Sequence, residues 1–148
     1  MDGFLSDNAS HQAIEILIDT MALGWNQHDA GLYAAVFTAD TEFTNTAGLT
    51  MKGRATIEDV HTEILSGLFK DSHMTTVETR IELLRPDVAT IAWRWEMSGA
   101  RNPNGRKRPK RQGFMSLIAT ADDGLWSIAR IHNMELPSAK PTEAAMKG

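Results

Sequence analysis

Two residues late in the sequence, His132 and Asn133, have side chains suited to chemistry at a binding site. A histidine titrates near neutral pH, so it can exchange a proton with a bound molecule. The two lie in residues 125–136, a run typical of a β-strand, where His132 alternates with Trp126 and Ile128. This alternation predicts that His132 points toward the helices, as an acid or base in a pocket or as a core histidine bonded to a neighbour.

Asn45 belongs to the stretch FTADTEFTNTAG, residues 37–48. In this stretch a polar segment from Thr38 to Asp40 precedes a short run of alternating polar and apolar residues. The Asn45 carboxamide can position a water molecule or a ligand, but it has no useful basicity near neutral pH. The stretch predicts either the mouth of a site or a helix end followed by an edge strand.

Other kinds of chemistry have little support in the sequence. The histidines form no HExxH motif and no pair at ligand spacing, so we expect no metal. There is no cysteine, and no Gly-rich phosphate loop or GxSxG motif, so we expect no cofactor. His61 borders the apolar stripe of a helix, where we expect a half-buried side chain with a satisfied hydrogen bond, beside a ligand pocket.

The elements that must position these residues are three helices followed by a meander. An amphipathic helix is predicted over residues 10–26, with Ser10 as its N-cap. Asp29 can cap a short second helix, and a third helix begins near Gly53. From His73 onward apolar and polar residues alternate, which predicts four long strands joined by turns.

This order predicts an α+β fold in which the three helices cover one face of a curved antiparallel sheet, with a short further strand at 41–45. A sheet curved around the first helix forms a cone with an open end, and apolar pockets with a few polar groups form in such mouths. The residues expected to contact a ligand there are Trp25, Tyr33, Phe37, Phe43, His61, Trp95, Phe114 and Asn133.

One strand, VATIAWRWEM, can face the cone in two ways. Trp93 and Trp95 share one side of the strand, and Arg94 and Glu96 share the other. If the tryptophans line the cone, the ion pair lies on the outer face of the sheet, at a contact between two copies of the chain.

The composition indicates one globular domain of 148 residues, which we place at 10–136 between tails at 1–9 and 137–148. No secretory leader and no membrane-length apolar run is visible, so we expect a cytoplasmic protein without a membrane partner. The net charge of −4 argues against a nucleic-acid partner. The basic segment RNPNGRKRPKRQG (101–113) lacks aromatic residues and is expected to be a solvated loop.

Three segments carry a resemblance to a known family: WNQHDAGLYAAVFTADTEFTNTAG, GRATIEDVH and WSIARIHN. They resemble the SgcJ/EcaC group of nuclear-transport-factor-2-like proteins, relatives of SnoaL-like polyketide cyclases and ketosteroid isomerases. The resemblance covers residues 10–136. It implies a cone-shaped domain that dimerises through the outer sheet face and binds a small organic molecule. It leaves open whether that molecule undergoes cofactor-independent lyase, isomerase, cyclase or hydratase chemistry or is only carried.

A second resemblance, to limonene-epoxide-hydrolase-like proteins, implies specific roles. The triplet FTN ending at Asn45 is similar to their aromatic-x-Asn pattern, and Arg94-x-Glu96 is similar to their Arg-x-Asp. This comparison implies that Asn45 positions water, that Glu96 or His132 takes its proton, and that Arg94 orients the carboxylate. Ketosteroid isomerases carry an acidic base at the position of Asn45, which an amide does not replace.

Overall fold

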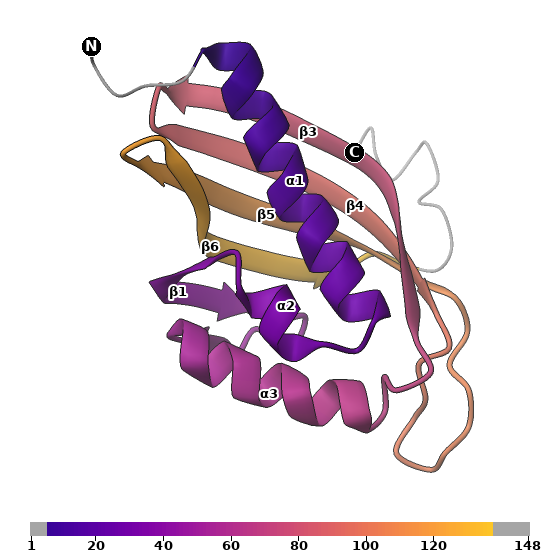
Figure 1. Ribbon diagram of the computed structural model, residues 1–148. Coiled ribbons are helices and arrows are strands. Elements are labelled where there is room, and N and C mark those ends of the chain that lie inside the picture. The colour runs from indigo at the N-terminus through magenta and orange to yellow at the C-terminus, as the bar shows by residue number, and fades with distance from the viewer. Residues whose placement is uncertain (1–5, 138–148) are drawn as a thin grey trace.

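The computed structural model describes residues 6–137, which form helices and one sheet (Figure 1). The helices are α1 (Asp7–Asn26), α2 (Ala30–Ala34) and α3 (Arg54–Ser66). The strands are β1 (Phe37–Thr44), β2 (Thr50–Lys52), β3 (His73–Arg85), β4 (Val88–Ser98), β5 (Arg111–Asp122) and β6 (Leu125–Glu135). Residues 7–9 of the predicted N-terminal tail thus belong to α1, and residues 138–148 of the predicted C-terminal tail lie outside the described part.

The helix starts follow from side chains that cap them. Ser6 caps α1, since its Oγ accepts a hydrogen bond of 3.2 Å from the Ala9 backbone N–H. The predicted cap, Ser10, is wrong: it lies one turn inside the helix and is buried. Asp29 caps α2 as expected, with Oδ1 accepting from a backbone N–H at 3.0 Å. Both caps satisfy N–H groups that have no partner within the helix.

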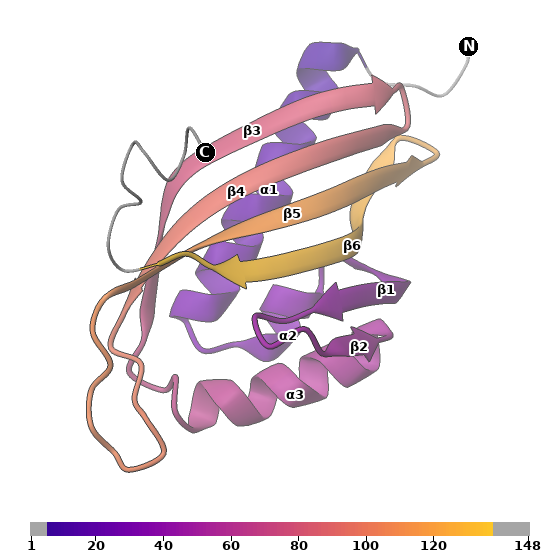
Figure 2. The same ribbon diagram turned by 180° about the vertical axis from the view of Figure 1, so that it is seen from behind.

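The six strands form a single sheet in the order β2-β1-β6-β5-β4-β3. Strands β3 to β6 form the predicted antiparallel meander. Strand β1 pairs with β6 in parallel, so the sheet is mixed and not wholly antiparallel as predicted. The sheet curves around α1, which crosses its concave face (Figure 1), and the view from behind shows the opposite, convex face of β3 to β6 in front of that helix (Figure 2). The predicted α+β cone is confirmed.

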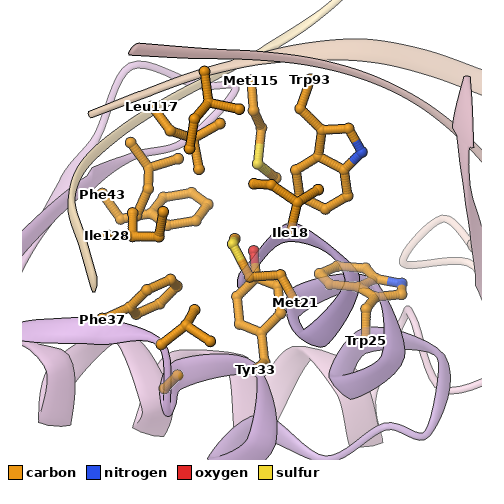
Figure 3. Packing of buried hydrophobic residues seen from close by; sticks show 14 of the residues in the cluster. Ile18, Met21, Trp25, Tyr33, Phe37, Phe43, Trp93, Met115, Leu117 and Ile128 are labelled. Atoms are coloured by element: carbon orange, nitrogen blue, oxygen red, sulfur yellow. The ribbon is translucent and has the colours of Figure 1, made fainter. Parts of the chain in front are cut away.

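The core fills the space between α1 and the concave face, as Figure 3 shows. The stripe of α1 contributes Ile14, Ile18, Met21 and Trp25, at the helical spacing that buries one face. Opposite them lie Ile91, Trp93, Met115 and Leu117 from β4 and β5. Burying each such side chain stabilises the fold by roughly 1.5–3 kcal/mol. Within the described residues, no helix is long and apolar enough to cross a membrane.

Candidate functional site

A cavity of about 200 Å³ opens at one end of the cone. Its wall combines the end of α1, both shorter helices, the turn after β1 and the concave ends of the sheet. The lining residues are Trp25, Tyr33, Phe43, Asn45, Thr46, Met51, Val60, His61, Ile64, Phe69, Met74, Trp95, Met97, Arg111, Met115 and Asn133. Most are apolar, so the few polar groups among them decide what chemistry the cavity supports.

His61 is the buried titratable base of this wall. It projects from α3 with 3% of its surface exposed, and its Nδ1 donates to the Ile57 carbonyl at 2.7 Å. A carbonyl only accepts, so Nδ1 carries the proton, and the lone pair of the neutral ring is on Nε2. Burial lowers the pKa of His61, partly offset by that hydrogen bond. His61 is therefore neutral and able to accept a proton at neutral pH.

Aromatic rings surround His61. The centroid of the Tyr33 ring lies 4.6 Å from the imidazole centroid, and the rings of Phe43 and Trp25 lie at 5.3 and 6.2 Å. Figure 3 shows Tyr33 rising from α2 with its hydroxyl toward the sheet. That hydroxyl is buried and has no hydrogen-bond partner among the described residues, and burial raises its pKa above the ordinary range. Tyr33 thus stays protonated and remains a free donor.

Two carboxamides lie at the mouth of the cavity. The Asn45 Oδ1 accepts from the backbone N–H groups of Ala47 and Leu49, both at 3.0 Å, and thereby shapes the turn between β1 and β2. The Asn133 Oδ1 accepts from Trp95 Nε1 at 3.0 Å. In both residues the acceptor oxygen is used by the protein, so the NH₂ group is the part left for a ligand.

Arg111 is the buried cation of the cavity. Its side chain lies over the rings of Phe69 and Trp95, with Cζ 5.5 and 5.9 Å from their centroids. Its Nη2 donates to Glu135 Oε1 at 2.6 Å. This hydrogen bond, more than the nearby positive charges, lowers the pKa of Glu135. The prediction that the basic segment is a solvated loop is wrong for Arg111, because β5 begins there and turns its side chain inward.

The structure gathers most of the predicted ligand contacts. Six of the eight predicted ligand contacts line the cavity, and so does Asn45; the six are Trp25, Tyr33, Phe43, His61, Trp95 and Asn133. Two of the eight do not. Phe37 is buried in the core, 5.6 Å from the ring of Tyr33 between centroids, and Phe114 lies on the convex face of β5. Phe37 begins β1 rather than continuing the second helix, which explains its different facing.

His132 does not reach the cavity, and its predicted facing is wrong. Strand β6 contains a bulge, since Ile118 pairs with Arg130 while the next residue, Ala119, pairs with Ile128. The extra residue reverses the alternation, so Trp126 and Ile128 are buried before it and Ile131 after it. His132 is therefore exposed on the convex face.

Arg94 and Glu96 also lie on the convex side of the sheet. Trp93 and Trp95 face inward, and Arg94 is exposed between them. Glu96 forms a salt bridge of 2.9 Å with Lys110. Asn45 thus has neither Glu96 nor His132 beside it in the cavity, and the arrangement implied by the epoxide-hydrolase resemblance is not formed there.

Arg111 and the sulfur side chains of the wall were not predicted from the sequence to line the site; the sulfur side chains are Met51, Met74, Met97 and Met115. The alternation of β4 and β5 could have placed Met97 beside Trp95, since both lie on one side of the strand. Methionine is flexible and adapts to ligands of irregular shape. Among residues 6–137 there is no cluster of three or more side chains that could hold a metal ion.

Comparison with known proteins places the chain among related folds. A structure from Caulobacter vibrioides, an uncharacterized protein with a cystatin-like fold, is 26% identical with a TM-score of 0.80, over 86% of this chain and 90% of that one. A hexachlorocyclohexane dehydrochlorinase from Novosphingobium barchaimii is 18% identical, with a TM-score of 0.77 over 93% of this chain and 99% of that one. A candidate scytalone dehydratase from Novosphingobium aromaticivorans is 17% identical, with a TM-score of 0.73 over 92% of this chain and 91% of that one. The last two likenesses concern the fold alone.

No curated protein matches the sequence significantly. The narrower resemblance to the SgcJ/EcaC group stays a prediction. A family model described as a SnoaL-like domain matches residues 7–132, which include all the helices and all but the end of the last strand. The chain therefore belongs to the SnoaL-like domain family and has the nuclear-transport-factor-2-like fold.

Proposed function

We propose that the protein is a cofactor-independent lyase that binds a small, mostly apolar organic molecule in the cavity and uses His61 as the base. The observation that carries this proposal is the His61 imidazole. It is buried, it is neutral, and its tautomer is fixed by the Ile57 carbonyl. A base held in this way at the wall of an apolar cavity is suited to removing a proton from carbon.

The proposed reaction is an elimination. His61 Nε2 takes a proton from a carbon atom of the ligand, and the electrons of that C–H bond form a new C=C bond. The group on the adjacent carbon leaves with the electrons of its own bond. Tyr33, whose ring lies closest to His61 among the aromatic neighbours, supplies a hydroxyl that donates to the leaving group. The protonated His61 then returns its proton to the leaving group or to water.

Cavity size and composition limit the substrate. Pockets for drug-sized ligands have about 300–1,000 Å³, whereas this cavity has about 200 Å³ and a wall rich in methionine and aromatic residues. A molecule of one or two rings with few polar groups fits these properties. Support also comes from the fold, because two similar structures are named for a dehydrochlorinase and a dehydratase, and both names describe eliminations.

The test compares two histidines in one chain. We expect His61→Gln to lower turnover at least about 100-fold, since general bases contribute about 10²–10⁴-fold, while ligand affinity changes little. His132→Gln is the matched control and should keep full turnover, because His132 lies on the convex face. The assay follows chloride release and C=C absorbance with one- and two-ring β-chloro and β-hydroxy ketones.

The outcomes separate the enzyme from a binding module. Full turnover in His61→Gln would remove the assigned base. Binding of these compounds by native mass spectrometry, without turnover of any of them by the unaltered protein, would favour a protein that only carries its ligand.

We also propose that the chain forms a homodimer through the convex face of β4, β5 and β6. This face combines exposed apolar side chains, Ile118 at 40% and Met134 at 47%, with Phe114 beside Met134 in the strand register. Covering such side chains favours association. Sedimentation at micromolar concentration should show a dimer that Ile118→Lys weakens, and a monomer in the unaltered protein would contradict this.

A further inference from the structure

The strongest unused feature of the cavity is the guanidinium of Arg111. Among residues 6–137 it is the only lysine or arginine that is buried, with 9% of its surface exposed. A guanidinium carries five N–H donors and no acceptor. Nη2 donates to Glu135, and Nη1 has only the Met97 sulfur at 3.9 Å, a weak acceptor. Nε is buried and has no partner among the described residues. Buried donors without partners are costly, so this one calls for an acceptor.

The charges around Arg111 do not balance. Arg108 and Arg111 share a single carboxylate, with Nη2 atoms 3.7 and 2.6 Å from Glu135 Oε1. Two guanidiniums against one carboxylate leave one positive charge. The other paired bases of the loop, Arg101 with Asp71 and Lys110 with Glu96, are balanced one to one. A ligand with one negative charge would complete the cluster.

The other polar groups at the mouth point to the same ligand chemistry. The acceptor oxygens of Asn45 and Asn133 are already used, so both residues offer N–H donors. Thr44 pairs with His132 in parallel register, which sets the following residues, Asn45 and Asn133, at one level of the sheet. A rim whose free groups are donors recognises an acceptor such as a carboxylate.

Arg111 is also held in place before any ligand arrives. It is fixed by Glu135 and by contact with the rings of Phe69 and Trp95. The Trp95 indole itself lies against Gly113, where a Cβ would be 1.9 Å from a ring carbon. A planar guanidinium that is already held in place binds a carboxylate with little loss of side-chain conformational entropy.

We propose that Arg111 and Asn133 bind the carboxylate of the ligand, so that the substrate class is small monoanionic carboxylic acids with a body of one or two apolar rings. This proposal rests on the proposed ligand cavity. The carboxylate lies at the mouth against the guanidinium of Arg111, and the rings extend inward among the methionine and aromatic side chains.

The experiment compares two probes of nearly equal shape, 2-naphthoate and its neutral amide, 2-naphthamide, by calorimetry on the full chain. The unaltered protein should bind the naphthoate at least tenfold more tightly. In the double variant Arg111→Gln/Glu135→Gln, which removes the buried ion pair and leaves only the half-exposed Arg108 charged, the preference should disappear while amide binding remains. Arg101→Gln removes a loop arginine outside the cavity wall and should keep the preference.

Equal affinity of the unaltered protein for both probes would overturn the carboxylate site but leave the cavity and its base standing. Retention of the preference in the double variant would overturn the role of Arg111. Failure of both probes to bind at millimolar concentration would contradict the cavity and this proposal together. If the double variant does not fold, the nitrogen-15 resonance of Arg111 Nε in the unaltered protein decides. It should shift with naphthoate and not with naphthamide, and no shift would overturn the proposal.

Discussion

The concave and convex faces of β4, β5 and β6 are made of alternating residues of the same strands, yet they differ in kind. The concave face carries Trp93, Trp95, Met115 and Leu117, and the convex face carries Arg94, Glu96, Ser116 and His132. On the concave face, polar groups occur at the open end of the cone, where Arg111 begins β5 before its apolar residues and Asn133 follows the apolar residues of β6. A polar residue type alone therefore does not mark the site, whereas a polar group on the buried face does.

The largest difference in stability should come from separate alanine substitutions of two neighbouring residues on β4. Trp93→Ala removes a fully buried indole and should lower the free energy of unfolding by about 3–5 kcal/mol. Arg94→Ala, one residue along on the convex face, should change it by less than about 0.5 kcal/mol. Urea denaturation measures both. Similar losses for the two variants would show that the faces are not as different as their burial indicates.

A smaller effect is expected at Gly113 on β5. An alanine Cβ there would meet the Trp95 ring at 1.9 Å, so the indole must move. We expect Gly113→Ala to cost about 1–3 kcal/mol, in line with other overpacked sites, and to change tryptophan fluorescence. Ser116→Ala, on the convex face of the same strand, is the control. Unchanged stability and fluorescence in Gly113→Ala would mean that Trp95 does not lie against this strand.

A pH titration of stability tests the burial of His61 on the concave side of the sheet. Because the pKa of His61 is lowered in the folded protein, the unfolded chain binds the proton more readily. The stability contributed by neutral His61 is therefore fully present above pH 6.5, the ordinary pKa of histidine. It declines as the pH falls from there toward the pKa of His61 in the folded protein. His61→Gln should flatten the decline seen in urea midpoints between pH 7.5 and 5.5. An unchanged slope in His61→Gln would contradict a buried neutral histidine.

The smallest effect concerns Glu135. Its carboxyl pKa is lowered by the hydrogen bond from Arg111, so its contribution is present above the ordinary value of 4.5 and is lost as the pH falls toward the folded pKa. Because the Glu135 side chain is partly exposed, and because a glutamine Oε1 can still accept the hydrogen bond from the buried Arg111, Glu135→Gln should cost less than about 1 kcal/mol at pH 7. Its urea midpoint should approach that of the unaltered protein below pH 4. A constant difference down to pH 3 would contradict this linkage.

The sequence predicts what depends on regular spacing. The stripe of α1 and the alternation along β4 and β5 repeat over enough residues to reveal which face is buried. The facing of His132 was not predictable in this way, because the single extra residue at Ala129 shifts the phase and has no Gly or Pro to signal it. Arg111 was missed for another reason. It ends a run of charged loop residues, and its burial depends on Glu135 and Trp95, which are distant in the sequence.

The parallel pairing of β1 with β6 has a consequence for synthesis on the ribosome. Strand β1 is bordered by β2 and β6, and β6 begins only at Leu125. While the nascent chain grows, Phe37 and Phe43 therefore have no strand on that side to cover them. Exposed apolar residues of this kind attract chaperones and favour aggregation. The ligand cavity, which needs Asn45 and Asn133 together, can close only after nearly the whole domain has left the exit tunnel.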